Sequence, residues 1–208
     1  MTTEPETQEA TPDAAELIQP VLADLSNLVA SVPPEAYDQP TPCPGMSVGD
    51  VRNHIVGWLT YFAQALADPS GEQPRVDPKE TRAPEDPTEA AAKVREAADS
   101  IRTSVAAGHA DGPVKLSSEL PGSAVLGMMV WEYQMHGWDL ARGANRPWNP
   151  PAAASEASLA FAPNMLSDEY RGEGKDFGPV VEVPEDAPAL DRLLGFSGRD
   201  PDWAPQVV

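Results

Sequence analysis

The sequence predicts an all-α protein, a four-helix bundle followed by a short, mostly irregular C-terminal extension. Apolar residues recur at helical spacing in four long segments, whereas almost no segment shows the alternation of a strand. Residues that cap helices also stand where these segments begin. Helices with one apolar face must bury it against one another, so four of them favour a bundle.

Capping residues and prolines delimit the first two predicted helices. Residues 13–32 begin with an Asp followed three positions later by Glu, and Pro33-Pro34 end the run. Residues 47–68 begin with a Ser whose expected capping partner is Asp50. Between the two helices, residues 41–45 read Thr-Pro-Cys-Pro-Gly, which cannot be helical because two prolines bracket the cysteine.

The next elements follow a long connection. Residues 69–86 are rich in Pro and charge and predict a crossover between helices. A third helix is predicted from the cap Asp86 to Gly108, with Pro in its first turn. After a short extended stretch at 114–117, a fourth helix is expected from Ser123 to about residue 143.

The end of the chain predicts less regular structure. An Ala-rich fifth helix is expected over residues 149–166, with Pro163 as a candidate early break, and a short helix near 188–195. Residues 1–12 are expected to form a disordered tail. Residues 13–208 are expected to form one domain, whose extension begins at about residue 167.

Composition narrows the classes of partner and location. The formal charge of −19 disfavours nucleic acid and membrane-surface partners, although solubility alone also explains such acidity. No apolar run is long enough to span a membrane, and no signal peptide is visible. The single cysteine, Cys43, excludes an internal disulfide and suits a reducing compartment, so a cytoplasmic location is expected.

Three residues predict a divalent-metal site. Glu132 and His136 are four residues apart on one predicted helix and therefore leave the same face. His54 lies inside another helix, beside its apolar stripe. One carboxylate and two imidazoles suit Zn(II), and also Ni(II), Fe(II) or Co(II), and three protein ligands leave a position for water or substrate. An ordinary contact between the two residues on the helix surface is the competing interpretation.

These residues lie in segments that resemble a known family. Residues 41–57, TPCPGMSVGDVRNHIVG, resemble the second-helix signature of actinobacterial DinB-like proteins, and more narrowly of the mycothiol-dependent maleylpyruvate isomerase N-terminal-domain group. Residues 132–142, EYQMHGWDLAR, are similar to the later signature of that group. Parts of residues 177–201, including Gly198-Arg199-Asp200-Pro201, resemble the C-terminal region of a small-protein branch.

The resemblance implies a helical bundle with a metal triad at His54, Glu132 and His136. It also implies a reaction in which the metal activates the thiol of mycothiol, which adds to the substrate and permits cis–trans rotation. This chain departs from the common pattern at Met46 and Gly49, and it is expected to lack the separate C-terminal domain of the isomerase. The isomerase reaction therefore does not carry over directly.

Further residues are candidates for supporting the site. Asp139 follows His136 by three residues and is expected to pair with Arg52 or Arg142, either to orient the site or as an ordinary salt bridge. Cys43 is a nucleophile or a fourth ligand whose pKa the nearby helix N-terminus would lower, or simply a small buried thiol.

Aromatic residues and the remaining histidine complete the candidates. Trp58, with Trp131 and Trp138, lines a pocket or belongs to an aromatic core. Tyr133 is a candidate proton donor, although its spacing does not single it out. His109 is expected in a solvated loop.

The sequence leaves three functions open. The first is a metal-dependent isomerase, lyase or transferase acting on a small molecule, with mycothiol as a possible thiol cofactor. The second is a non-catalytic protein that binds a metal or ligand, and the third is a structural helical domain. The expected partners are a small-molecule substrate or thiol, and either a monomer or a homodimer is compatible with the sequence.

Overall fold

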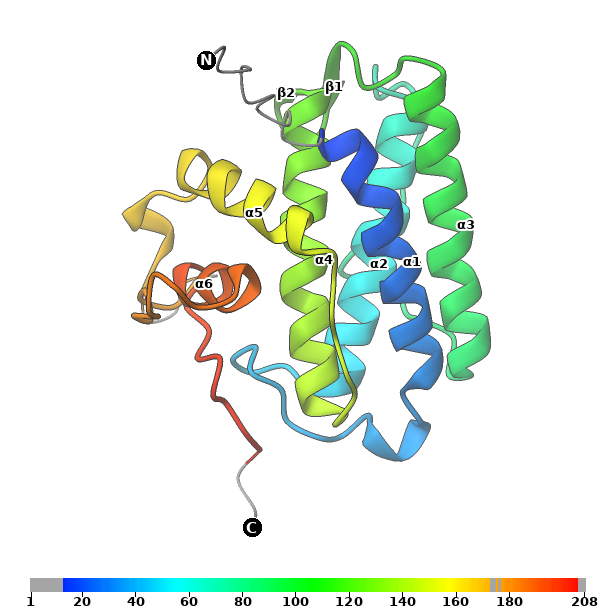
Figure 1. Ribbon diagram of the computed structural model, residues 1–208. Coiled ribbons are helices and arrows are strands. Elements are labelled where there is room, and N and C mark those ends of the chain that lie inside the picture. The colour runs from blue at the N-terminus through cyan, green and yellow to red at the C-terminus, as the bar shows by residue number, and fades with distance from the viewer. Residues whose placement is uncertain (1–12, 173–174, 176, 206–208) are drawn as a thin grey trace, which may run out of the picture.

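The computed structural model describes residues 13–172, 175 and 177–205, so the predicted tail at 1–12 lies outside the described residues. Its long helices are α1 (Ala14–Ser31), α2 (Val48–Ala67), α3 (Pro87–Ala106) and α4 (Gly122–Gly143), followed by the shorter α5 (Ala152–Phe161) and α6 (Ala189–Phe196) (Figure 1). Single 3-10 turns lie at η1 (Pro34–Ala36), η2 (Ala162–Asn164) and η3 (Asp168–Tyr170). The predicted all-α bundle with an irregular C-terminal part is confirmed.

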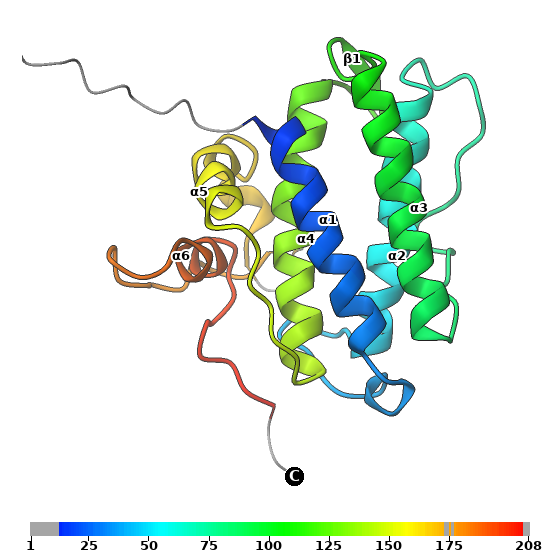
Figure 2. The ribbon, with the colours of Figure 1, turned by 45° about the vertical axis from the view of Figure 1, so that its right-hand side comes forward.

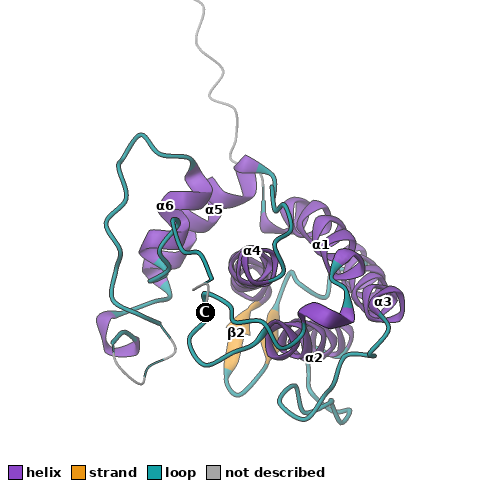
Figure 3. Cartoon of the chain, turned by 90° about the horizontal axis from the view of Figure 1, so that it is seen from below, coloured by secondary structure: helices purple, strands orange, loops and turns teal. Residues whose placement is uncertain are grey.

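The four long helices form a closed bundle. Helices α1 and α2 each pack against both α3 and α4, as the end-on view shows (Figure 3). Helices α2 and α3 run in the same direction: near their N-termini Arg52 donates to the carbonyl of Glu85 at 3.2 Å, and beyond their C-termini His109 Nδ1 lies 3.0 Å from the carbonyl oxygen of Leu66. A parallel pair needs a long connection, which is the physical reason for the crossover. His109 lies in a turn after α3, as predicted, but it is half-buried and links two helix ends, so its expected solvation is wrong.

The helix starts follow the predicted caps. Asp13 and Asp86 each accept hydrogen bonds from backbone N–H groups of the first helical turn. Ser47 and Asp50 form a reciprocal capping box at the start of α2. These local interactions satisfy N–H groups that have no partner within the helix. This explains why the helix starts could be predicted from the sequence.

Two later elements differ from the prediction. Helix α5 begins at Ala152 because two prolines precede it, and it ends at Phe161, before η2. Pro163 lacks an N–H donor, so the helix stops short of residue 166. The expected extended stretch is the strand β1 (Pro113–Lys115), and its antiparallel partner β2 (Glu119–Pro121) was not predicted.

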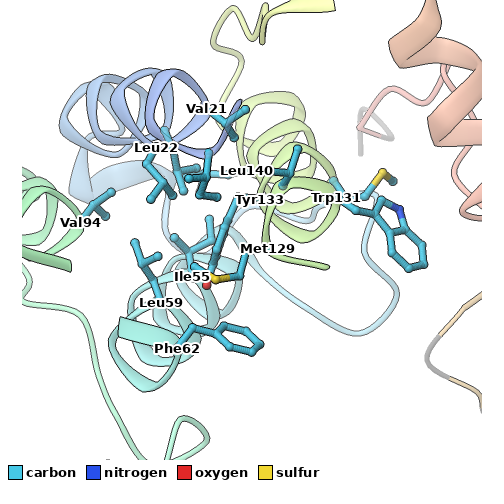
Figure 4. Packing of buried hydrophobic residues seen from close by; sticks show 14 of the residues in the cluster. Val21, Leu22, Ile55, Leu59, Phe62, Val94, Met129, Trp131, Tyr133 and Leu140 are labelled. Atoms are coloured by element: carbon cyan, nitrogen blue, oxygen red, sulfur yellow. The ribbon is translucent and has the colours of Figure 1, made fainter. Parts of the chain in front are cut away.

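The core lies between the four long helices. Figure 4 shows Leu22 from α1, Leu59 from α2, Val94 from α3 and Leu140 from α4 pointing into one interior, and all four are almost fully buried. Trp131 points the other way, out of the bundle (Figure 4). Among the described residues, no helix has the length and apolar character needed to cross a membrane.

Helices α5 and α6 lie outside the bundle: α5 packs against α4 and α1, and α6 packs against α5 (Figure 2). Gln134 on α4 is fully buried and fixes α5: its amide nitrogen donates to Ser158 Oγ at 2.9 Å and its amide oxygen accepts from Ser155 Oγ at 2.6 Å. Trp148 donates to the backbone carbonyl of Gln134 at 3.1 Å. A fully satisfied polar cluster thus holds α5 against the face of α4 that faces away from the core.

Replacing Gln134 with Leu is expected to lower the free energy of unfolding by roughly 2–3 kcal/mol, because Ser155 and Ser158 lose buried partners. Chemical denaturation of the purified protein measures the change. The exposed Gln73 gives a matched control, since Gln73→Leu is expected to change stability by about 0.5 kcal/mol or less. Equal effects of the two substitutions would show that the buried cluster does not hold α5.

Candidate metal centre

Packing of α2 against α4 brings His54, Glu132 and His136 together. His54 Nε2 lies 2.9 Å from Glu132 Oε1, and His136 Nε2 lies 3.4 Å from the same oxygen. The two imidazole centroids are 4.4 Å apart. Glu132 and His136 project from one face of α4 because they are four residues apart, whereas His54 reaches them from the neighbouring helix.

One side of this cluster is open to solvent. The side chains of His54 and Glu132 are 26% and 31% exposed, whereas that of His136 is 10% exposed. The crossover lies against α2 one turn beyond His54: a Cβ at Gly57 would stand 2.3 Å from the carbonyl oxygen of Pro78. Glycine is therefore required there for the crossover to approach the helix.

The cluster is strongly coupled electrostatically. Burial raises the pKa of Glu132, but the two imidazoles outweigh it, His136 more than His54, and the pKa lies far below its usual range. Burial lowers the pKa of His136, but Glu132 and Asp139 outweigh it and raise the pKa to about 9. In the absence of an ion, a proton on His136 therefore neutralises the Glu132 carboxylate.

The same residues fit a divalent metal ion. The three ligand atoms lie within 4.8 Å of one another. Tetrahedral ligands at typical Zn–N and Zn–O bond lengths stand about 3.3 Å apart. The separations of 2.9 and 3.4 Å around Glu132 Oε1 bracket that value. The donor set is one that Zn(II), Ni(II), Fe(II) and Co(II) accept.

Asp139 and Arg199 stand behind His136. Asp139 Oδ2 lies 3.1 Å from His136 Nδ1, a close contact whose direction falls short of a hydrogen bond. Arg199 donates to both oxygens of Asp139, from Nη2 at 3.0 Å and from Nε at 3.4 Å. The side chains of Asp139 and Arg199 are 0% and 7% exposed.

The predicted pairing of Asp139 with Arg52 or Arg142 is wrong. Arg52 donates to backbone carbonyls of Pro84 and Glu85, and its guanidinium lies over an aromatic ring on the crossover side of α2. Arg142 donates to the carbonyl of Pro201 from the surface. The true partner, Arg199, is 60 positions away in the sequence, so helical spacing cannot predict the pair. The one feature of the sequence that pointed to Arg199 is its place in the C-terminal motif at 198–201.

Cys43 lies on the same side as Arg199. Its Sγ is 3.4 Å from Met46 Sδ and 4.0 Å from Arg199 Nη2. Burial and the charge of Asp139 raise the pKa of the thiol to about 11, although Arg199 opposes the shift. The suggestion that the helix N-terminus lowers this pKa is therefore wrong. The surroundings favour the small packed thiol over the nucleophile, although Cys43 is only half-buried.

Of the aromatic candidates Trp58, Tyr133 and Trp131, only Trp58 borders the cluster, whereas the other two point elsewhere. The ring centroid of Trp58 lies 6.1 Å from that of His54, and Trp58 is half-buried, so it borders the cluster. Tyr133 lies in the core with its hydroxyl buried and without a hydrogen-bond partner among the described residues (Figure 4). Burial raises its pKa well above the usual value. Trp131 donates instead to Ser197 Oγ at 3.0 Å and so contacts the C-terminal part of the chain.

Comparison with known proteins identifies the family of the chain. Residues 18–141 match the family described as mycothiol maleylpyruvate isomerase N-terminal domain. The chain belongs to this family. The matched span contains the three clustered residues and Asp139 but not Arg199.

Two relatives come from Mycobacterium tuberculosis, one from strain CDC 1551 and one from strain H37Rv, and both are described as uncharacterized proteins. Each is 27% identical over 173 residues, which cover 83% of this chain and 90% of the relative. No solved structure matches the chain significantly.

Alkylation of Cys43 by iodoacetamide tests the protonated thiol. A pKa of about 11 instead of 9.0 lowers the thiolate fraction at pH 8 about 100-fold, so the native protein is expected to react at least that much more slowly than the unfolded chain. Mass spectrometry after chelator treatment gives both rates. Comparable rates in the two states would show that Cys43 is a reactive thiol.

Proposed function

We propose that this protein binds one divalent metal ion, most naturally Zn(II), through His54, Glu132 and His136. We further propose that it uses the ion to process a small molecule with a low-molecular-weight thiol such as mycothiol, in an isomerase, transferase or lyase reaction. The supporting observation is that the three ligand atoms converge within 4.8 Å on a side of the bundle open to solvent. Membership of a family named for a mycothiol-dependent isomerase supports the thiol.

The chain would supply three ligands to the ion and leave the solvent-exposed side of the ion free for a substrate or thiol. A bound ion would act as a Lewis acid that stabilises a thiolate or polarises a substrate oxygen. Exposed edges of His54 and Glu132 face that side, and Trp58 provides an apolar surface beside it. A small thiol or acid can therefore reach the cluster without opening the bundle.

Metal analysis of protein purified without a His tag tests the ligand assignment. About one ion per chain is expected, and His54→Ala, Glu132→Gln and His136→Ala are each expected to lower the affinity at least 10-fold, because each removes one of three ligands. His109→Ala is the matched control. His109 contacts the carbonyl of Leu66 near the C-terminus of α2, away from His54 in the first half of that helix. Wild-type metal affinity in the Glu132 and His136 variants would contradict the assignment.

Thiol exchange at the ion separates an enzyme from a binding protein. In Co(II)-substituted protein, adding mycothiol or another small thiol is expected to produce a thiolate-to-cobalt charge-transfer band. Cys43→Ser protein is the control that excludes the internal thiol as the source of the band. An unchanged spectrum at saturating thiol would argue against thiol chemistry.

A non-catalytic metal-binding protein of the same fold is the second candidate. One observation favours it: among the described residues, the two extra candidates for proton transfer or nucleophilic attack are unsuited to either role. Tyr133 is enclosed in the core, and burial raises the pKa of Cys43. Metal binding without thiol exchange would support this second function.

A further inference from the structure

A second set of potential metal ligands overlaps the first. Cys43 Sγ, a nitrogen of His136 and an oxygen of Asp139 also lie within 4.8 Å of one another. His136 belongs to both sets, with Nε2 toward Glu132 and Nδ1 toward Asp139. Thiolate, imidazole and carboxylate are good zinc ligands. A feature of the structure must therefore favour one of the two sets over the other as the metal site.

The guanidinium of Arg199 already lies at this second set. It donates to both oxygens of Asp139, to the carbonyl of Ser197 at 3.1 Å, and approaches Cys43 Sγ at 4.0 Å. Its side chain is 7% exposed and its donors are directed at these groups, so it has little capacity to bind a substrate anion. A fixed positive charge there repels a second cation and neutralises the buried carboxylate.

The backbone after α6 places Arg199 accurately. Gly198 has φ +78°, and a Cβ there would stand 2.7 Å from the carbonyl oxygen of Gly178, so only glycine fits this close approach. The N–H of Arg199 donates to the carbonyl of Leu194 at 2.9 Å, which closes the end of the helix. The hydrogen bond from Trp131 to Ser197 ties the same turn to α4.

We propose that Arg199 is a positioning residue that acts as an internal cation at the Cys43–His136–Asp139 set. It excludes a metal ion from that set and keeps Cys43 out of the coordination sphere. It also holds Asp139 next to His136 Nδ1, so that His136 presents Nε2 to the first set. The inference rests on the proposed metal site, and it makes the C-terminal part of the chain a component of that site.

Co(II) titration followed by absorption spectroscopy tests this role. The wild-type protein is expected to bind one equivalent without a thiolate-to-cobalt band. In Arg199→Met, Cys43 is expected to lose its thiol proton to solvent and bind the ion, so that a thiolate band appears. In Arg199→Met/Cys43→Ser the band is expected to be absent and the affinity about 10–100-fold below wild type, because Asp139 no longer orients His136.

Arg142→Met is the matched control, because Arg142 also ties α4 to the C-terminal part of the chain but lies at the surface. It is expected to keep the wild-type spectrum and affinity. Circular dichroism establishes that each variant folds. If Arg199→Met does not fold, Arg199→Lys keeps the charge but loses the paired hydrogen bonds, and it is expected to bind Co(II) about 10-fold more weakly without a thiolate band.

Three results would overturn the proposal: a thiolate band in the wild-type protein, a folded Arg199→Met protein with wild-type spectrum and affinity, or an Arg199→Lys protein with wild-type affinity. Failure of the wild-type protein to bind any Co(II) would refute the proposed function instead. The two failures are therefore distinguishable.

Discussion

A line of ionisable side chains runs from the solvent-exposed side of the bundle inward past α4. Along it His54, Glu132, His136, Asp139 and Arg199 follow one another at contact distance. Each successive pair is joined at 2.9 to 3.4 Å. A carboxylate as buried as Asp139 is stable only when neighbouring groups compensate its charge. The line therefore constrains which helices must meet and where the end of the chain must lie.

The bundle and the C-terminal part of the chain supply different ends of this line. Helices α2 and α4 bring the two imidazoles to Glu132, and the turn after α6 brings the guanidinium to Asp139. The family match ends at residue 141, before that turn. Residues outside the shared family domain thus contact the group that stands directly behind His136.

The arrangement also explains why His136 lies at the centre of this line, between the two carboxylates. An imidazole that offers Nε2 to a metal must carry its proton on Nδ1, and Asp139 is the acceptor nearest to that nitrogen. Without a metal, burial lowers the pKa of His136, but the charges of Glu132 and Asp139 outweigh burial and raise it to about 9, which favours the protonated ring. Replacement of that proton by an ion would leave the remaining contacts of the line in place.

The sequence alone determined the features that depend on local interactions. Capping residues and prolines specified the starts of α1, α2 and α3, because the hydrogen bonds involved join residues two or three positions apart. The spacing of Glu132 and His136 specified their shared face for the same reason. Tertiary structure decided the partner of Asp139, the strand β2 and the direction of Tyr133, since each depends on segments that meet only after folding. Arg52 and Arg199 illustrate the difference: only packing reveals which guanidinium reaches the buried carboxylate, because nothing in local spacing distinguishes one arginine from the other.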